Sequence, residues 1–461
     1  MKILHAIHDF LPRHRAGSEI YAFRLCRELS RRHEVGVLCA EYDPSRPHGS
    51  LASRLYEGLP VRELVNNWAF STFAETYRSA QINEGLDQVL AEERPDVLHI
   101  HNLLNLSFDL PDLARARGIP SVATLHDFTL VCPSGGQRVH VAEEHVCRDI
   151  DTRRCSRCFP QSPFHSQLAL GRAALPVTRL GPVRRLVSLA RTALPTSFGV
   201  ATRALSRGIG AAVDEREIKE RLREVGRVIE AVALFVAPSR ALAADFERFG
   251  IPREKIRISD YGFAPLERLR SRKMADRLRI GFVGTLVWHK GAHVLLEAIR
   301  RLPADRVEVK IFGDPHTFPD YVARLRKMAE GLPVRFMGTF GSERAGEVYG
   351  EIDVLVVPSL WPENSPLVIH EAFLAGVPVV GSRIGGIPEL VEHDRNGLLY
   401  DAFSVPDLAE TLRGLIEDPT RLRRFADALP AIKSLEQDAM EWEAIYAQVR
   451  AGLPLATTSA L

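Results

Sequence analysis

Short apolar runs alternate with amphipathic stretches along the first half of the chain. The apolar runs that have the length of a β-strand are 2–10, 33–39, 96–101 and 120–125. A helical pattern over 18–31 follows the first run. Strands that alternate with helices of about 10–15 residues are typical of βαβ units around a parallel sheet. We therefore expect a doubly wound α/β domain over residues 1–262.

The second half repeats this rhythm more regularly. Its apolar runs are 279–284, 307–313, 334–338, 354–359, 378–382 and 397–400. Helical patterns such as 292–301 and 366–375 separate them, and the runs lack polar alternation, which is typical of strands buried on both faces. We expect a second doubly wound domain over 275–435, a C-terminal helix over 436–452 that returns to the first domain, and a disordered tail over 453–461.

The stretch 261–278 is predicted to link the two domains, because it contains Gly262, Pro265 and many charged residues. Two doubly wound domains that face each other leave a central cleft at the carboxyl ends of their strands. Ligands of such sheets bind at those strand ends.

Composition narrows the class of protein. The chain has 461 residues, of which 46% are hydrophobic and 26% charged, and its formal net charge is +2. This near-neutral charge argues against a nucleic-acid partner, and no apolar run reaches the roughly 18 residues of a membrane-spanning helix. The apolar N-terminus includes His5, His8 and Asp9 and predicts a strand, not a signal peptide. We expect a cytoplasmic protein whose six cysteines form no disulfide framework.

The segment 359–372 carries the most chemistry. A strand ends at Ser359, a loop with Glu363 follows, and a helix that contains Glu371 is predicted to begin at Pro366, capped by Asn364 or Ser365. A helix N-terminus at a strand end is a diphosphate site. Two glutamates eight residues apart are common by chance, and the alternative is that both are ordinary surface residues. The Gly-Val-Pro-Val-Val run at 376–380 and the Gly-Gly-Ile-Pro-Glu run at 385–389 favour the functional interpretation.

With these neighbours, the segment resembles glycosyltransferase family 4. That family is marked by a Glu-x7-Glu motif between a Pro-Ser strand end and an Ala-Gly-x-Pro-Val-Val junction. The matching residues are Pro358, Ser359, Glu363, Glu371, Ala375, Gly376 and Pro378. The resemblance implies a GT-B fold, an α/β architecture in which two Rossmann-like domains face a central cleft. It also implies that Glu371 binds the nucleotide ribose, Glu363 binds the transferring sugar, and the backbone near Ser365 and Leu367 lies at the diphosphate.

A second motif supports the resemblance. The run 282–291 is similar to the family's Gly-Arg-Leu-x-x-x-Lys-Gly loop, in which the lysine neutralises the leaving diphosphate, a role that falls here to Lys290. The alternative is a solvated loop lysine. Thr285 stands in place of the family's arginine, so one positive charge is missing. The resemblance places the nucleotide base near Gly313 and near Gly338.

The first half matches the family more loosely. Gly17 follows the first strand and opens a helix, so its backbone is expected to approach the ligand. His126 closes the strand at 120–125, and the equivalent histidine in the family contacts the donor sugar; the alternative is a structural hydrogen bond. His99 and His101 face the same way on one strand, and for them the structural interpretation is favoured.

Together these residues predict a retaining glycosyltransferase that uses a nucleotide-sugar donor, UDP- or GDP-linked, without a catalytic metal, since no DxD motif stands out. The family implies a sugar or lipid-linked saccharide acceptor in cell-surface polysaccharide or glycolipid synthesis. Two alternatives remain. One is a GT-B sugar-nucleotide epimerase or phosphorylase. The other is a catalytically silent scaffold of a polysaccharide assembly complex, which the missing arginine at Thr285 suggests.

The segment 132–158 is rich in cysteine. Cys155 and Cys158 form a CxxC pair, and Cys132 and Cys147 complete the four ligands of a tetrahedral structural zinc site. His140 and His145 are candidate substitutes for one ligand. The alternatives are unpaired cysteines in a loop or a redox pair at the CxxC.

The segment 161–210 is predicted to be a basic helical insert that contains seven arginines and no Asp or Glu. The arginines are Arg172, Arg179, Arg184, Arg185, Arg191, Arg203 and Arg207. They are interleaved with apolar residues, a pattern that allows peripheral binding to the anionic inner face of a membrane. The equally weighted alternative is a helical excursion packed on the first domain.

Overall fold

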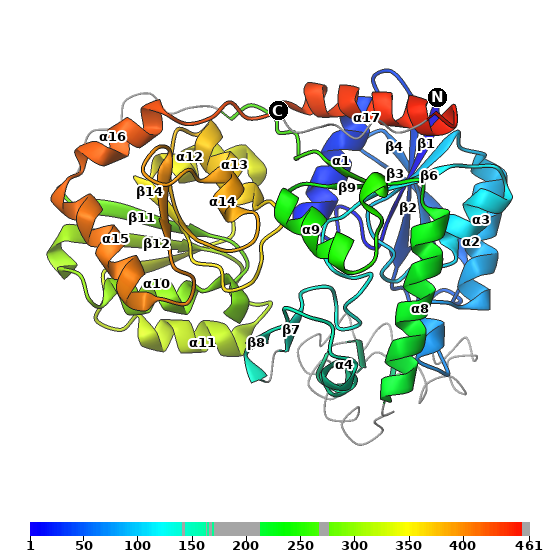
Figure 1. The fold of residues 1–461 in the computed structure, drawn as a ribbon, viewed down its shortest axis with the longest axis horizontal. Coiled ribbons are helices and arrows are strands. Elements are labelled where there is room, and N and C mark those ends of the chain that lie inside the picture. The colour runs from blue at the N-terminus through cyan, green and yellow to red at the C-terminus, as the bar shows by residue number, and fades with distance from the viewer. Residues whose placement is uncertain (141–142, 163, 166–167, 170–212, 267–275, 454–461) are drawn as a thin grey trace. The chain divides into compact units, whose positions relative to one another are not determined.

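The computed structural model describes residues 1–140, 143–162, 164–165, 168–169, 213–266 and 276–453. All seven arginines of the basic segment, residues 267–275 of the predicted linker and the predicted disordered tail from 454 onward lie outside these ranges. The chain divides into two compact units (Figure 1). Unit 1 is Met1–Pro238, Ala243–Ser259 and Asp438–Leu461, and unit 2 is Ser239–Leu242 and Asp260–Gln437.

The described part of unit 1 is built on an eight-stranded sheet with the order β10-β9-β6-β5-β1-β2-β4-β3. Its strands are β1 (Lys2–Ile7), β2 (Glu34–Glu41), β3 (Leu51–Tyr56), β4 (Leu59–Val65), β5 (Val97–Ile100), β6 (Ser121–Thr124), β9 (Leu234–Ala237) and β10 (Ile256–Ile258). All pairs are parallel except β3 with β4. β1 and β5 are buried almost throughout, as the apolar runs predicted.

The hairpin of β3 and β4 was not predicted. Its strand β3 alternates between half-buried and exposed residues at the sheet edge, so it lacks an apolar run. The turn residues Glu57 and Gly58 both have positive φ, 44° and 84°, as a tight hairpin turn requires. An acidic residue followed by glycine was the available signal, and the run of polar residues around it concealed the strand.

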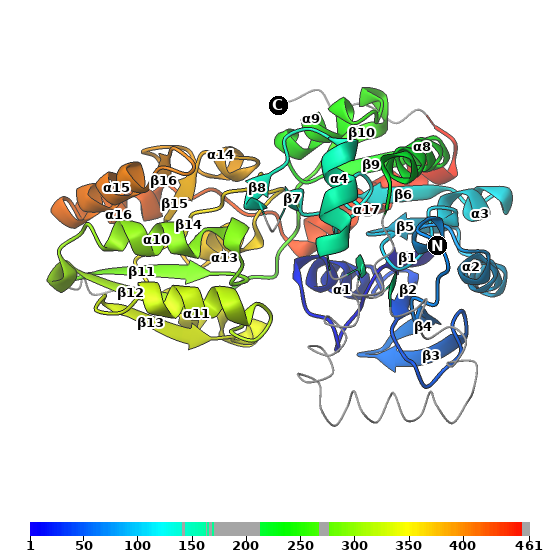
Figure 2. The same cartoon turned by 90° about the horizontal axis from the view of Figure 1, so that it is seen from below.

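Helices surround the sheet of unit 1. They are α1 (Gly17–Leu29), α2 (Ala80–Glu93), α3 (Leu110–Ala116), α4 (Thr152–Cys158), α8 (Glu215–Ala231), α9 (Arg240–Arg248) and α17 (Leu435–Arg450). Most of α17 belongs to unit 1 and lies beside α1, where Trp442 donates a hydrogen bond to the Tyr21 hydroxyl (Figures 1 and 2). A small hairpin of β7 (Val139–His140) and β8 (His145–Val146) precedes α4.

The described part of unit 2 is a six-stranded parallel sheet with the order β13-β12-β11-β14-β15-β16. Its strands are β11 (Leu278–Val283), β12 (Val307–Phe312), β13 (Val334–Gly338), β14 (Val354–Val357), β15 (Val379–Ser382) and β16 (Gly397–Tyr400). Every strand predicted in this half is present within two residues of its expected bounds. β14, β15 and β16 are buried throughout, as the apolar runs predicted, whereas β12 and β13 alternate between more and less buried residues.

Helices cover both faces of this second sheet. They are α10 (Ala292–Ile299), α11 (Pro319–Met328), α12 (Ala345–Gly350), α13 (Leu367–Leu374), α14 (Ile387–Leu390), α15 (Val405–Glu417) and α16 (Thr420–Asp427). Residues of α10, α11, α15 and α16 share one buried core, and residues of α12, α13 and α14 share the other. Figure 1 shows these two groups on opposite sides of the strands.

Each sheet has a point at which the strand order reverses. In unit 1 this point lies between β1 and β5, and in unit 2 it lies between β11 and β14. At such a point the loops that leave the two neighbouring strands run in opposite directions, which opens a crevice at the carboxyl ends. The loops after β1, β5, β11 and β14 are therefore the first places to look for a site.

Candidate active site

Lys290 and Glu363 meet at the reversal point of unit 2. Lys290 ends the short 3-10 turn Trp288–Lys290 after β11, and Glu363 lies in the loop after β14. The Lys290 Nζ is 2.7 Å from Glu363 Oε1 and 2.9 Å from Oε2, and Ser359 donates a hydrogen bond of 2.7 Å to Oε1. The glutamate side chain is only 6% exposed, whereas the lysine side chain is 28% exposed. A fixed carboxylate thus holds a lysine that still has access to solvent.

Position 291, directly after Lys290, requires a glycine. Its φ is +74°, and a Cβ at this position would lie 1.8 Å from the carbonyl oxygen of Pro358. The loop after β11 therefore packs directly on the end of β14, which brings Lys290 to Glu363. The lysine also lies over the ring of Trp361, with its Nζ 5.3 Å from the ring centroid, a cation–π contact.

Helix α13 carries the other predicted donor residues. It begins at Leu367, and Pro366 is its N-cap. The helix was expected to begin near Pro366 and begins one residue later, but the expected cap, Asn364 or Ser365, was wrong, because Pro366 itself is the N-cap. No side chain in the described part of the chain caps this helix, because Ser365 donates to Asp260 instead, at 2.7 Å. The first-turn N–H groups and the positive end of the helix dipole thus point toward the loop that holds Glu363.

Glu371 lies on α13 and is held by a buried tyrosine. Tyr349, from α12, donates its hydroxyl hydrogen bond to Glu371 Oε2 at 3.1 Å and also lies 3.2 Å from the carbonyl oxygen of Val368. Burial, together with the charge of Glu371, raises the pKa of Tyr349 well above its ordinary value, so the tyrosine remains a donor. The carboxylate orientation is therefore set by a neighbour that sequence reasoning did not identify.

Asp260 is a second residue that the sequence analysis missed. Its Oδ2 is 2.8 Å from Nε2 of His370, its Oδ1 accepts the Ser365 hydroxyl, and His370 stacks on Phe263 with ring centroids 4.6 Å apart. Burial raises the pKa of Asp260, but the hydrogen bonds and charge of His370 and the bond from Ser365 outweigh it, and the net pKa is lowered. This network fixes the loop and the first turn of α13 from behind. Asp260 carried no motif signal, because it lies outside the Glu-x7-Glu segment.

The predicted base-binding glycines lie side by side at the ends of β11, β12 and β13. The Gly284 N–H donates to Phe312 O at 3.1 Å, and the Gly313 N–H donates to Gly338 O at 2.9 Å. A Cβ at Gly313 would lie 2.3 Å from the carbonyl oxygen of Gly284. Glycine at 313 therefore allows the ends of β11 and β12 to pack closely, because any side chain there would collide with Gly284 and Leu286.

Gly17 and His126 lie in unit 1, and Lys290, Gly313, Gly338, Glu363, Ser365, Leu367 and Glu371 lie in unit 2. Gly17 is exposed and begins α1. The helix N-terminus there already has an acceptor, since Glu19 accepts hydrogen bonds from the Ala16 N–H at 3.1 Å and the Ser18 hydroxyl at 3.2 Å. The chain's own carboxylate thus occupies the place that an anion would take at α1.

His126 is half-buried and ends a hydrogen-bonded chain of histidines whose other members, His5 and His101, are buried. His5 Nδ1 is 2.9 Å from His101 Nε2, and His101 Nδ1 is 2.9 Å from His126 Nε2. His99 is bonded at both nitrogens, to Tyr446 of α17 at 2.7 Å and to Thr124 at 2.8 Å. These hydrogen bonds support the structural interpretation of His99 and His101. His5 was not predicted to take part, although its pairing with His99 across β1 and β5 follows from the sheet.

Burial keeps these histidines neutral. It lowers the pKa of His5 and of His126 to about 3, the latter with a smaller contribution from His8. It also lowers the pKa values of His99 and His101 well below their ordinary value. Ligand atoms of His5, His99 and His101 lie within 4.8 Å of one another. Five of the six ring nitrogens are already in hydrogen bonds, so the group is better described as a hydrogen-bonded network than as a metal site.

The four predicted zinc ligands line one small cavity of unit 1. Cys132, Cys147, Cys155 and Cys158 surround a volume of about 30 Å³, and none forms a disulfide. Burial, and then the neighbouring cysteines, raise the pKa of Cys155 to about 12. Burial also raises the pKa of Cys158 to about 11.

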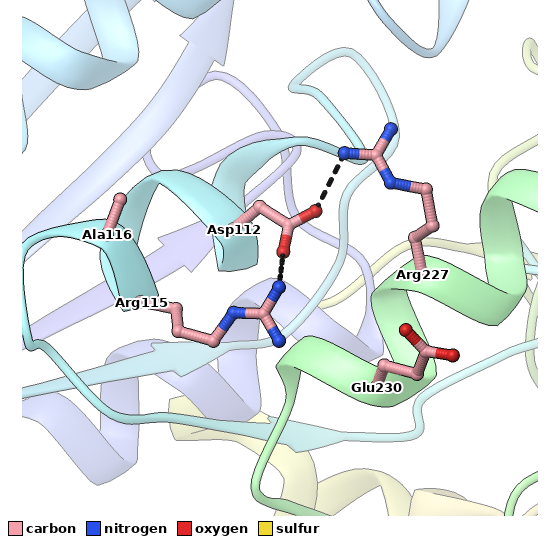
Figure 3. A pocket seen from close by; sticks show the side chains of 5 residues that line it. All are labelled: Asp112, Arg115, Ala116, Arg227 and Glu230. Atoms are coloured by element: carbon pink, nitrogen blue, oxygen red, sulfur yellow. Dashed lines mark hydrogen bonds and ion pairs between the residues drawn. The ribbon is translucent and has the colours of Figure 1, made fainter.

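A larger surface pocket of about 350 Å³ lies elsewhere on unit 1 (Figure 3). Asp112 accepts hydrogen bonds from Arg115 at 2.6 Å and from Arg227 at 3.0 Å. These residues lie on α3 and α8, which lead into the amino ends of β6 and β9. The arginines are paired within the pocket, and doubly wound sheets bind ligands at the opposite strand ends. This pocket is therefore a weak candidate for the site.

Among the described helices, none combines the length and the apolar character needed to cross a bilayer.

Comparison with known proteins matches both halves of the chain to glycosyltransferases. Residues 15–189 match the family profile described as Glycosyltransferase Family 4, and residues 277–418 match the profile described as Glycosyl transferases group 1. The chain is 29% identical over 237 residues to a sulfoquinovosyl transferase of Arabidopsis thaliana, an alignment that covers 48% of this chain and 44% of the relative. It is 33% identical over 189 residues to a D-inositol 3-phosphate glycosyltransferase of Corynebacterium efficiens, covering 39% and 43%. The chain thus spans less than half the length of these curated relatives.

A solved structure extends the comparison to the whole fold. HepE of Anabaena, in complex with UDP-glucose, has a TM-score of 0.59 at 17% identity, and the alignment covers 98% of this chain and 99% of that chain. At this identity the likeness concerns the fold alone, and it confirms the predicted two-domain, Rossmann-like GT-B architecture. The family assignment rests on the two profile matches, over residues 15–189 and 277–418, which identify the chain as a glycosyltransferase of family 4.

Proposed function

We propose that this protein transfers a glycosyl group from a nucleotide-sugar donor to a hydroxyl acceptor, with retention of anomeric configuration. The observation that carries the proposal is the pair of Lys290 and Glu363, 2.7 Å apart at the reversal point of unit 2. A buried glutamate that holds a solvent-accessible lysine suits a ligand with both an anionic diphosphate and sugar hydroxyls.

Each donor group is assigned a partner. The Lys290 ammonium and the first N–H groups of α13, near Ser365 and Leu367, stabilise the diphosphate. Glu363 accepts hydrogen bonds from hydroxyls of the transferring sugar, and Glu371 accepts them from the ribose. The strand ends at Gly313 and Gly338 take the base, and His126 and the Gly17 backbone contribute from unit 1. This assignment gives the diphosphate charge to Lys290 and the helix terminus, not to a metal.

The reaction is proposed as a same-face displacement. The bond between the anomeric carbon and the phosphate oxygen breaks, and the acceptor oxygen bonds to the same face of that carbon. The proton of the acceptor hydroxyl passes to the departing phosphate oxygen, so no protein nucleophile is required. The protein contributes position and electrostatic stabilisation, which are the largest sources of rate in reactions of this kind.

The relatives suggest which ligands to try first. The UDP-glucose complex of HepE supports a uridine diphosphate sugar, with a GDP-sugar as the second choice. The relatives named for sulfoquinovosyl and inositol phosphate transfer support a sugar or lipid-linked acceptor, and we place the reaction in cell-surface polysaccharide or glycolipid synthesis. We also propose a cytoplasmic protein that binds the inner face of the membrane through the arginines of 161–210, each worth about 1 kcal/mol near an anionic surface. Sedimentation with anionic vesicles, compared with neutral vesicles, tests this part.

The experiment for the main proposal has two stages. Thermal melting with UDP, GDP and ADP identifies the nucleotide, and hydrolysis of the matching nucleotide sugars then identifies the donor. We expect one nucleotide to raise the melting temperature, and Glu363→Gln to keep that shift while donor turnover falls. Binding without any turnover would favour the silent scaffold, for which Thr285 in place of an arginine is the supporting feature. No shift with any nucleotide would contradict both.

A further inference from the structure

The cysteine cavity of unit 1 has the size of a site for a single ion. Its volume is about 30 Å³, close to the space of one water molecule and far below the roughly 300 Å³ of a small organic ligand site. All four cysteines of the segment 132–158 reach it, whereas Cys26 and Cys39 are buried separately in α1 and β2. Four sulfur atoms around so small a volume match the ligand set of structural zinc.

Three separate pieces of backbone deliver the four side chains. Cys132 ends a turn in which its N–H donates to Phe128 O at 2.7 Å, and Cys147 follows β8, with its N–H donating to Arg138 O at 2.7 Å. Cys155 and Cys158 are three residues apart on α4, so they lie on one face of that helix. A CxxC pair on one element with two further cysteines from other elements is the usual construction of a four-thiolate site.

The surrounding chain holds these pieces in place. Arg138 is nearly fully buried; it lies 3.2 Å from Asp245, donates to the carbonyl of Arg148, and packs over Phe128 and Phe249. Such fixed supports on both sides of Cys147 are what a pre-organised metal site needs.

A second arginine fixes the other side of the cavity. Arg221 of α8 is buried and donates to the carbonyls of Thr129 and Leu130 at 2.6 and 2.8 Å, which fixes the turn that ends at Cys132. Arg138 and Arg154 line the cavity itself, and so do Asp149 and Asp151, so the formal charges of the lining side chains balance.

His140 and His145, the alternative metal ligands, contact other residues. His140 Nδ1 accepts the Glu143 N–H at 3.3 Å, and its Nε2 is 3.4 Å from the Glu143 carboxylate. His145 Nε2 is 2.8 Å from the Arg154 guanidinium. Neither histidine lines the cavity, so the ligand set with four sulfurs is favoured over one with three sulfurs and a nitrogen.

We infer that Cys132, Cys147, Cys155 and Cys158 bind one zinc ion as a closed structural site. Binding forms four Zn–S bonds, and the four thiol protons leave to solvent, with no change of oxidation state. Among the described residues, no three of the four cysteine Sγ atoms lie within 4.8 Å of one another. Zinc binding therefore requires the cysteine side chains to turn toward the centre of the cavity.

The site also ties down the strand end that carries His126. Directly after His126, Asp127 accepts hydrogen bonds from the Thr129 N–H at 2.8 Å and from Asn102 at 2.9 Å. The Phe128 N–H donates to Gly136 O at 3.0 Å. A metal that anchors Cys132 thus limits the motion of the residues between it and His126. This inference is independent of the proposed transferase activity, since it concerns the order of a loop.

Elemental analysis of the full chain, purified without chelator, tests the inference. We expect about one zinc per chain, lost in Cys155→Ser and Cys158→Ser and kept in the matched control Cys39→Ala, which removes a thiol outside the cavity. Because a cysteine variant can fail to fold, the wild-type protein is also titrated with a mercurial while a colorimetric chelator reports released zinc. Release of one zinc as four thiols react, together with faster amide exchange in 127–160, supports the site. A folded chain that takes up no zinc after incubation with Zn²⁺ and dialysis, or that keeps zinc in Cys155→Ser, would overturn it.

Discussion

The two reversal points of this molecule have the same backbone construction and opposite chemistry. At the point between β1 and β5, unit 1 places His5, His99 and His101, neutral and hydrogen-bonded to one another or to hydroxyl groups. At the point between β11 and β14, unit 2 places a charged pair, Lys290 and Glu363. The same strand order thus carries neutral, hydrogen-bonded histidines in and directly after β1 and β5 in one unit, and an ion pair in the loops after β11 and β14 in the other.

The free-energy cost of burial differs between the charged pair of unit 2 and the neutral histidines of unit 1. A buried charge needs a partner and further hydrogen bonds, which Ser359 and Lys290 supply to Glu363. A buried neutral imidazole needs only hydrogen bonds, which the histidine chain supplies internally. An anionic diphosphate is stabilised by the first arrangement and gains little from the second. The comparison predicts that charge-changing substitutions act on nucleotide chemistry in unit 2, whereas acid acts mainly on unit 1.

The largest expected effect comes from the lysine of unit 2. Lys290→Ala removes the only side-chain cation assigned to the leaving diphosphate, and we expect turnover to fall by roughly 10²–10³-fold, as when one transition-state donor is lost. Steady-state donor hydrolysis measures this fall. Glu363 keeps its hydrogen bond from Ser359, so the variant is expected to fold.

The control is a lysine with a similar ion pair away from the strand ends. Lys310 on β12 lies 2.8 Å from Glu351, and Lys310→Ala should leave turnover within about twofold, as expected for a pair remote from the chemistry. Equal losses in both variants would mean that Lys290 acts only through stability, and the contrast between the two reversal points would lose its functional meaning.

Most strands and loops of unit 2 could be predicted from the sequence. β14, β15 and β16 of unit 2 are buried throughout, so apolar runs marked them. Gly291 and Pro366 marked the loops, because glycine and proline have strict backbone requirements. The residues that hold the predicted site residues in place could not be predicted. Tyr349 and Asp260 reach Glu371 and His370 from elements distant in sequence, and no periodicity or motif encodes such contacts.

The next effect in size separates the two glutamates. Glu371→Ala should weaken binding of the free nucleoside diphosphate by about 10- to 150-fold, which corresponds to the roughly 1.5–3 kcal/mol of a charge-assisted hydrogen bond. Glu363→Gln should leave that affinity unchanged and lower turnover, because its assigned partner is the sugar. Isothermal calorimetry gives both affinities. Glu410→Ala, at an exposed pair with Arg413, is the control, and a Glu371→Ala variant with wild-type affinity would refute the ribose assignment.

Acid should weaken unit 1 before unit 2. The folded-state pKa values of His5 and His126 are about 3, below the ordinary value of 6.5. Their contribution to the free energy of unfolding is therefore complete above pH 6.5 and is lost as the pH falls toward 3. Each such histidine lowers that free energy by up to about 1.4 kcal/mol per pH unit. At the strand ends of the described part of unit 2, His289 is the corresponding buried histidine, with a pKa of about 3.

Urea unfolding at pH 7, 6 and 5 measures this difference. Trp68 and Trp442 lie in unit 1, and Trp288 and Trp361 lie in unit 2, so a variant with phenylalanine at one pair reports the other unit by fluorescence. We expect the unit 1 midpoint to fall more steeply with pH. Parallel slopes in the two units would show that the histidine chain is not held neutral.

The histidine chain also shows where sequence reasoning stopped. His126 and the spacing of His99 and His101 were visible, but His5 was treated only as part of a first strand. Its role depends on the parallel register that sets His5 beside His99, and register between strands almost a hundred residues apart leaves no local pattern. The packing of α17 against His99 through Tyr446 was hidden for the same reason.

The smallest expected effect tests whether the neutral Tyr349 hydroxyl orients the Glu371 carboxylate in unit 2. Neutral hydrogen-bonding groups orient the histidines of unit 1 in the same way. Tyr349→Phe removes the hydroxyl that donates to Glu371 at 3.1 Å and leaves the carboxylate in place. A hydrogen bond of this kind contributes about 0.5–1.5 kcal/mol, so nucleotide affinity should fall by roughly 2- to 10-fold, much less than in Glu371→Ala. Tyr400→Phe is the matched control, because that hydroxyl is buried in unit 2 without a hydrogen-bond partner among the described residues, and its affinity should match the wild type. If both variants bind equally well, Tyr349 packs beside Glu371 without orienting it. If only Tyr349→Phe binds more weakly, and Tyr349→Phe adds little further loss in a Glu371→Ala background, the two residues act as one unit in holding the ribose.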